Sequence, residues 1–106
     1  MYMLTKTEEI LLLAIWQLAE DAYGVRIRQH VSTLIRRDFT YGNLYSALNQ
    51  LVNKKYVSKT VGDPTPDRRG RPKAYYRITS YGLEALRAAR EMNDALWGSI
   101  PEYAFK

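Results

Sequence analysis

The sequence contains no cysteine, which excludes disulfide bonds, thiol nucleophiles and cysteine-ligated zinc. Its single histidine, His30, lacks the neighbouring ligands of a metal motif, so we expect neither a metal site nor a cofactor. A nucleophile–base arrangement and a paired-carboxylate motif are also missing. Gly70-Arg71-Pro72 does not lead into the lysine-serine ending of a phosphate-binding loop. These absences indicate that the protein is not an enzyme.

Long hydrophobic runs are missing as well. The longest, from Ile10 to Trp16, is far too short to span a bilayer. Lys6, Glu8 and Glu9 ahead of it do not resemble the basic flank of a signal peptide. We therefore expect a soluble, cytoplasmic protein with no membrane partner.

What is present is a basic chain of one-domain size. Its 106 residues are 46% hydrophobic and 25% charged, as in an ordinary folded domain. A domain this small would gain stability by sharing a core with a second copy. The net charge of +5 and the pI of about 9.6 favour a polyanionic partner, either nucleic acid or an acidic membrane surface.

The first helix is predicted over residues 6–18, after a capping box made by Thr5 and Glu8. It is apolar on nearly every side, so one face should pack within the domain and another against a second subunit. A second helix should begin near Tyr23-Gly24 and end before Arg36. Its apolar stripe consists of Ile27, Val31, Leu34 and Ile35.

A third helix should begin after Thr40, a plausible N-cap. Its apolar stripe consists of Leu44, Leu48, Leu51 and Val52. The opposite face is polar but uncharged, and it carries Tyr41, Asn43, Ser46, Asn49, Gln50 and Asn53. An ordinary solvated face would carry glutamate and lysine, which are better helix formers. Amides and hydroxyls there indicate a face selected for hydrogen bonding.

Two β-strands are predicted next, over residues 56–61 and 74–78. The residues between them are rich in proline, glycine and arginine, which indicates an exposed loop at the tip of a hairpin. Thr79 or Ser80 should then cap a last helix that reaches to about Ser99. This helix, roughly 30 Å long at 1.5 Å per residue, could clasp a second subunit. Its apolar stripe consists of Ala85, Leu86, Ala89, Met92 and Leu96.

These elements predict a mainly α fold with a small β-hairpin, a winged helix-turn-helix. Residues 1–79 would form the DNA-binding domain and residues 80–106 a C-terminal dimerisation helix and tail. The third helix would enter the major groove with the residues at its N-terminal end: Thr40, Tyr41, Gly42, Asn43, Tyr45, Ser46 and Asn49. For Tyr45, packing and base contact are both open. The hairpin tip would bind phosphates or a minor groove through Arg68, Arg69, Arg71 and Lys73.

The sequence resembles the PadR family of transcriptional regulators. The resemblance rests on Tyr23-Gly24, on the segment from Gly42 to Leu48, and on the segment from Gly70 to Thr79 closed by Gly82. It implies a winged helix whose last helix packs against the first helix of the other subunit. It also implies repression of nearby genes that a small molecule relieves. The single terminal helix is similar to the short subgroup of the family.

Nine residues are expected at the dimer interface or in a pocket for a small hydrophobic or aromatic effector: Leu11, Ile15, Trp16, Leu86, Ala89, Met92, Asn93, Leu96 and Trp97. Some drug-sensing relatives stack planar cations on a tryptophan of the last helix, but here that slot falls at Asn93, one turn before Trp97. The two tryptophans are therefore favoured as interface anchors.

The sequence thus predicts a homodimeric repressor that binds specific sites on double-stranded DNA. The alternative is a winged helix that serves as a protein-interaction or assembly module without specific DNA binding. The uncharged polar face of the third helix and the arginines of the hairpin tip both favour DNA.

Overall fold

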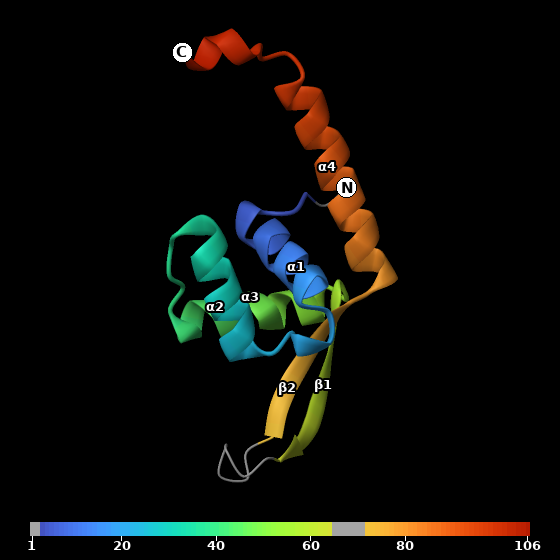
Figure 1. The fold of residues 1–106 in the computed structure, drawn as a ribbon. Coiled ribbons are helices and arrows are strands. Elements are labelled where there is room, and N and C mark those ends of the chain that lie inside the picture. Colours follow the sequence, from blue (N-terminus) through green and yellow to red (C-terminus); the bar gives the residue numbers. More distant parts are fainter. Residues whose placement is uncertain (1–2, 65–71) are drawn as a thin grey trace.

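A computed structural model describes residues 3–64 and 72–106 of the chain. The elements within this part, in chain order, are α1 (Lys6–Leu18), the 3-10 turn η1 (Ala19–Asp21), α2 (Gly24–Ile35), α3 (Tyr41–Asn53), β1 (Val57–Pro64), β2 (Pro72–Ile78), α4 (Ser80–Trp97) and the 3-10 turn η3 (Glu102–Phe105). Helices α1–α3 form a body from which the hairpin and α4 extend in opposite directions (Figure 1). The predicted winged helix-turn-helix fold is confirmed.

Threonine residues are the N-caps of three of the helices. Thr5 accepts a hydrogen bond from the Glu8 amide at 3.1 Å, and the Glu8 carboxylate accepts one from the Thr5 amide at 2.8 Å. Thr40 and Thr79 cap α3 and α4 in the same way, each by accepting a hydrogen bond from an amide three residues on. The predicted helix starts are therefore confirmed, since these side chains satisfy amides that lack a partner within the helix.

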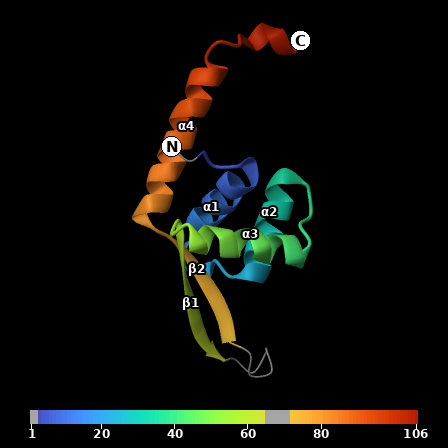
Figure 2. The same cartoon turned by 180° about the vertical axis from the view of Figure 1, so that it is seen from behind.

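The hydrophobic core lies between the three helices of the body and the base of the hairpin. It is made of apolar side chains that are almost completely buried, among them Leu11, Leu12, Ile15, Ile27, Val31, Leu44, Leu48, Leu51, Val57 and Tyr76. Figure 2 shows α3 crossing the body on the side opposite to the view of Figure 1. The apolar stripes of α1, α2 and α3 thus meet inside a single protomer.

Three positions differ from the expectations. Leu34 was predicted in the core stripe of α2, but it is 58% exposed, because in the last turn of α2 it is Ile35, in line with Ile27 and Val31, that packs against the core. Leu11 and Ile15 were predicted at the dimer interface or in an effector pocket; both are enclosed in the protomer's own core, and Ile15 also lines a small hollow with Trp16 and Leu83. A side chain with almost no exposed surface cannot cover a second subunit.

The hairpin is longer than predicted and is joined to the helical body by an isolated β-bridge. β1 and β2 pair antiparallel from Val57 opposite Ile78, with an irregularity between Val61 and Pro64. The Tyr76 amide donates to the Ala22 carbonyl at 2.8 Å, and Tyr23 forms a β-bridge with Tyr75. The residues between η1 and α2 therefore tie the wing to the helical body.

The start of α4 is fixed against the end of α3. The Thr79 amide donates to the Tyr56 carbonyl at 3.0 Å, and the Thr79 hydroxyl donates to the Lys55 carbonyl at 2.6 Å. A Cβ atom at Gly82 would overlap the Tyr56 carbonyl oxygen and lie 2.7 Å from Cγ1 of Ile78. Only glycine lets the first turn of α4 approach the chain this closely.

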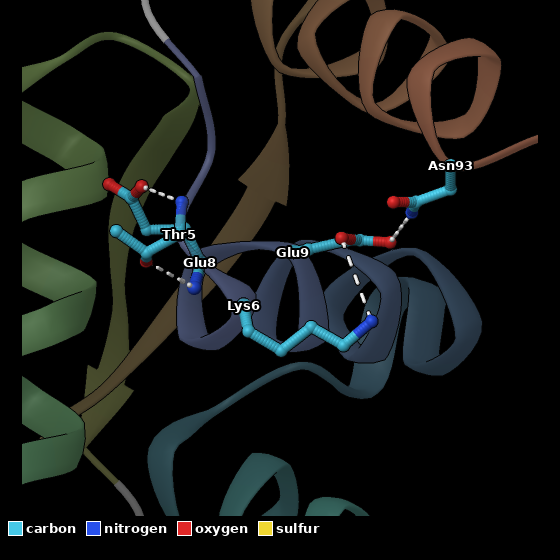
Figure 3. A network of polar contacts seen from close by, with 5 residues as sticks. All are labelled: Thr5, Lys6, Glu8, Glu9 and Asn93. Carbon is cyan, nitrogen blue, oxygen red and sulfur yellow. Dashed lines mark hydrogen bonds and ion pairs between the residues drawn. The ribbon is translucent and has the colours of Figure 1, made fainter. Parts of the chain in front are cut away.

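Further along, α4 runs beside α1 and then projects away from the body. Asn93 donates a hydrogen bond to the Glu9 carboxylate at 3.2 Å, and Lys6 lies 3.9 Å from the same carboxylate (Figure 3). Beyond this contact the helix is exposed, and the ring of Phe105 stacks on that of Trp97 at 6.2 Å between centroids. No helix of the described residues is long and apolar enough to cross a membrane.

A partly buried ion pair connects the first turn of α1 with Lys54, the C-cap residue of α3. The Glu8 carboxylate, whose side chain is 4% exposed, lies 2.6 Å from Nζ of Lys54. The same carboxylate completes the capping box of α1, so it binds both the Thr5 amide and the lysine. Its burial is tolerated because a cation and a backbone amide replace the water that it loses.

Removal of the lysine charge should therefore destabilise the fold. We expect Lys54→Met to lower the free energy of unfolding by about 1–3 kcal/mol, between the values typical of exposed and of fully buried pairs. Urea denaturation measures the change, and Lys55→Met provides the control, because it removes the charge of the adjacent exposed residue. Equal losses in the two variants would contradict this role of the pair.

Candidate nucleic-acid interface

One end of α3 presents a continuous polar surface. All seven residues predicted there for DNA contact are at least partly exposed: Thr40, Tyr41, Gly42, Asn43, Tyr45, Ser46 and Asn49. The apolar residues of the same helix, Leu44, Leu48 and Leu51, have no exposed surface. Burial of one stripe thus fixes the rotation of α3 about its own axis and turns the amides and hydroxyls outward.

The polar face of α3 carries no acid that would repel a phosphate group. Its first turn also points its backbone amides outward along the helix axis, where the helix dipole favours an anion. The side chains of Asn43 and Asn49 have both donors and acceptors, which matches the mixed pattern of base edges. This end of α3 can therefore accept a phosphate backbone and read bases next to it.

Arg28 on α2 supports the start of α3, a role that the sequence analysis missed. Its Nε donates to the carbonyl of Phe39 at 2.6 Å, and its guanidinium carbon lies 4.6 Å from the centroid of the Tyr41 ring. The rings of Tyr41 and Tyr45 stack at 6.2 Å with 20° between their planes. The i, i+4 spacing of the two tyrosines was the signal available in the sequence, but their partner on α2 was not visible.

The wing contributes the described residues Lys73, Tyr75, Tyr76 and Arg77. Tyr76 is buried and Tyr75 is only partly exposed, since adjacent residues of a strand point to opposite faces and only one ring enters the core. Burial raises the pKa of the Tyr76 hydroxyl, and the nearby Tyr45 adds to this effect. Arg77 is exposed.

Lys73 lies at the base of the wing tip, with its ammonium nitrogen 4.3 Å from the centroid of the Tyr23 ring. That ring also meets Tyr75 edge to face at 5.7 Å. The predicted contacts Arg68, Arg69 and Arg71 lie outside the described residues. Of the predicted wing residues, the structure thus places only Lys73.

A second surface, between α1 and α4, is apolar. A hollow of about 490 Å³ lies there, lined by Glu9, Leu13, Trp16, Leu83, Leu86, Arg87, Arg90, Asn93 and Asp94. Trp16, Met92, Leu96 and Trp97, four of the predicted interface residues, are exposed, whereas Leu86 is partly covered and Ala89 is buried. Leu13 and Leu83 were not predicted, although both are exposed and line the hollow together with Trp16.

The described residues contain no group of three or more histidine, cysteine, aspartate or glutamate side chains that could hold a metal ion. A model of the transcriptional regulator PadR-like family matches residues 11–88, which include α2, α3 and the whole hairpin. The chain belongs to the PadR-like family. The predicted resemblance is confirmed, and the protein is a transcriptional regulator rather than an enzyme. Among curated proteins, no significant match was found.

Solved structures of PadR-like and other winged-helix proteins share the fold. A PadR-like transcriptional regulator from Bacillus cereus is 25% identical, with a TM-score of 0.67 over 87% of this chain and 81% of that chain. RosR of H. salinarum is 24% identical, with a TM-score of 0.70 over 93% and 82% of the two chains. F93 from STIV, described as a winged-helix DNA-binding protein, is 17% identical, with a TM-score of 0.67 over 88% and 92%.

Two residues that carry the PadR resemblance, Gly24 and Tyr45, are in direct contact. A Cβ atom at Gly24 would overlap the hydroxyl of Tyr45 and lie 2.6 Å from its Cζ atom. The Tyr45 hydroxyl is thus directed toward the start of α2 within the protomer. Of the two roles left open for this tyrosine, the geometry favours packing.

Substitution of the two glycines of this surface should have opposite effects. Gly24→Ala forces the Tyr45 ring outward, and we expect it to lower the free energy of unfolding by about 1–3 kcal/mol through overpacking. Gly42 has nothing within 4 Å of an added Cβ atom. Gly42→Ala should leave stability unchanged or raise it by up to about 1 kcal/mol, because alanine favours the helix.

Thermal unfolding of the two variants measures this difference. Tyr45→Ala should also cost less in the Gly24→Ala background than in the wild-type protein, because the two residues are coupled. Similar unfolding temperatures for both glycine variants would disprove the contact.

Proposed function

We propose that this PadR-like regulator binds specific sites on double-stranded DNA as a homodimer and represses transcription until a small molecule releases it. The observation that carries the proposal is the exposed, uncharged polar face at the start of α3, opposite the buried Leu44, Leu48 and Leu51. The major groove admits one α-helix, and amides and hydroxyls at its end match the donors and acceptors of base edges.

The wing would supply affinity rather than sequence preference. The net charge of +5 favours association with a polyanion, and three arginines fall between positions 68 and 71. Arginine forks to phosphate oxygens and enters narrow minor grooves, so these side chains suit the backbone on either side of the major groove that α3 reads. The β-bridge at Tyr23 and the hydrogen bond from the Tyr76 amide to Ala22 hold the wing beside α2, which supports simultaneous contact by α3 and wing.

Homodimer formation through α1 and α4 is supported by the apolar surface that one protomer leaves uncovered. Trp16 and Trp97 are both 59% exposed, and Leu96 is 63% exposed. Several large exposed apolar side chains along these two helices are typical of an interaction surface. The family resemblance supports a second copy as the partner, with α4 of one subunit against α1 of the other.

The same surface offers a place for an effector. The hollow between α1 and α4 is lined by apolar side chains, Leu13, Trp16, Leu83 and Leu86, together with polar and charged ones. This mixture suits a small hydrophobic or aromatic molecule. Repression and its release come from the family resemblance.

Substitutions on the α3 face and on the wing should change DNA affinity in different ways. Asn43→Ala, Ser46→Ala and Asn49→Ala should each weaken binding to the operator by about 1–3 kcal/mol and hardly change binding to scrambled DNA. A triple Arg68→Ala, Arg69→Ala, Arg71→Ala variant should weaken binding to both DNAs. It should also flatten the slope of log affinity against log salt by about one unit for each phosphate that is no longer bound.

The operator is obtained by selection of bound DNA from a random pool, and affinities are measured across a salt series. A salt slope near zero for the wild-type protein would favour the protein-interaction module instead. Helix variants that bind operator and scrambled DNA with equally reduced affinity would refute base readout by α3. Gly42→Ala gives a further check, because a methyl group at the groove should reduce operator binding without any loss of stability.

Dimer formation should depend on the exposed tryptophan and leucine. Trp16→Gln and Leu96→Gln should each shift the protein toward monomer, since a buried apolar side chain of this size contributes about 1.5–3 kcal/mol. Analytical ultracentrifugation over a dilution series measures the shift. Leu34→Gln is the matched control, because Leu34 is similarly exposed at 58% but lies on α2. An unaltered dimer in both interface variants would exclude this surface.

A further inference from the structure

We infer that Arg28 is a positioning residue that sets the start and rotation of α3. Its consequence for operator preference rests on the function proposed above. Arg28 lies in the middle of α2 and is partly buried, and it reaches the turn that leads into α3. It touches the residue before the N-cap, Phe39, and the residue after it, Tyr41.

Two short ridges meet between α2 and α3. On α2, Gly24 and Arg28 are four residues apart and lie on one face of the helix; on α3, Tyr41 and Tyr45 have the same spacing. Tyr45 fits over Gly24, and Tyr41 lies under the Arg28 guanidinium. Because two contacts one helical turn apart are matched, they resist rotation of α3 about its axis as well as sliding along it.

The chemistry of the contact calls for arginine. Nε donates to the Phe39 carbonyl at 2.6 Å, while the guanidinium carbon lies over the Tyr41 ring, 4.6 Å from its centroid. Lysine keeps the charge but lacks a planar group that both donates and stacks. The Phe39 carbonyl lies between α2 and α3, where no helix or strand supplies an amide donor, so a side chain can satisfy it.

A residue with this geometry acts on base readout indirectly. Asn43, Ser46 and Asn49 are placed by the rotation of α3, and hydrogen bonds to base edges weaken steeply when their angles change. Removal of the Arg28 side chain should therefore reduce the preference for the operator over random DNA. Removal of a mere phosphate contact would weaken binding to both DNAs.

The test compares Arg28→Ala and Arg28→Lys with Arg26→Ala. Arg26 lies on the same helix and pairs with Asp21 at 3.2 Å, so its removal takes away the same charge without touching α3. We expect Arg28→Ala to reduce the ratio of operator to random affinity by about tenfold or more, in the range of one base contact. Arg26→Ala should leave that ratio unchanged, and Arg28→Lys should recover little of it.

Amide hydrogen exchange gives a second readout that needs no DNA. The Leu44 amide donates to the Thr40 carbonyl in the first turn of α3. In Arg28→Ala, its exchange should accelerate about tenfold or more relative to amides of α1, which report global opening. The inference is overturned if exchange at Leu44 stays as in Arg26→Ala, or if Arg28→Lys fully restores operator preference.

An equal decrease of operator and random affinity in Arg28→Ala would also overturn the inference, because Arg28 would then be a phosphate contact. A wild-type protein that does not distinguish the two DNAs would refute the proposed function instead. In that case the exchange at Leu44 alone decides on Arg28.

Discussion

The hydrogen bond from the Tyr76 amide to the Ala22 carbonyl joins the hairpin to the helical body. The proposed DNA surface depends on both of these parts. A two-stranded hairpin alone is marginally stable, so it needs a third strand or a packed face. Here it has a packed face, since the Tyr76 ring is buried in the core, and one isolated β-bridge at Tyr23 adds to its support. The segment of residues 22–23 runs directly into α2, whose first residue carries the contact with Tyr45. The wing and α3 are therefore tied to one short stretch of backbone.

Local chemistry made most of the fold predictable. Thr5, Thr40 and Thr79 cap their helices as the sequence indicates, because capping involves only neighbouring residues. Leu44, Leu48 and Leu51 face the core because helical periodicity brings them onto one face. The polar face of α3 follows from the same periodicity, so the helix half of the candidate site was predictable.

Contacts between distant segments were not predictable. Nothing in the spacing of α2 indicates that Arg28 meets Tyr41, since this depends on the turn between two helices. The single bridge at Tyr23 is too short for any periodicity. The fully apolar run of α1 indicated two burial partners but could not say which residue faces which, so it did not reveal that Leu11 and Ile15 are enclosed in the core. Trp16, expected at the outer surface, is exposed.

The way α4 is attached gives it a mechanical property. Its first turn is held at Tyr56 and Lys55, next to the base of the hairpin, while its eighteen residues place the last turn about 27 Å away at 1.5 Å per residue. A tilt of about 10° around that fixed end would move the far end by about 5 Å, by the same helix geometry. Force applied near Trp97 thus acts on the hairpin base with a long moment arm, opposed between the two ends by the hydrogen bond from Asn93 to Glu9.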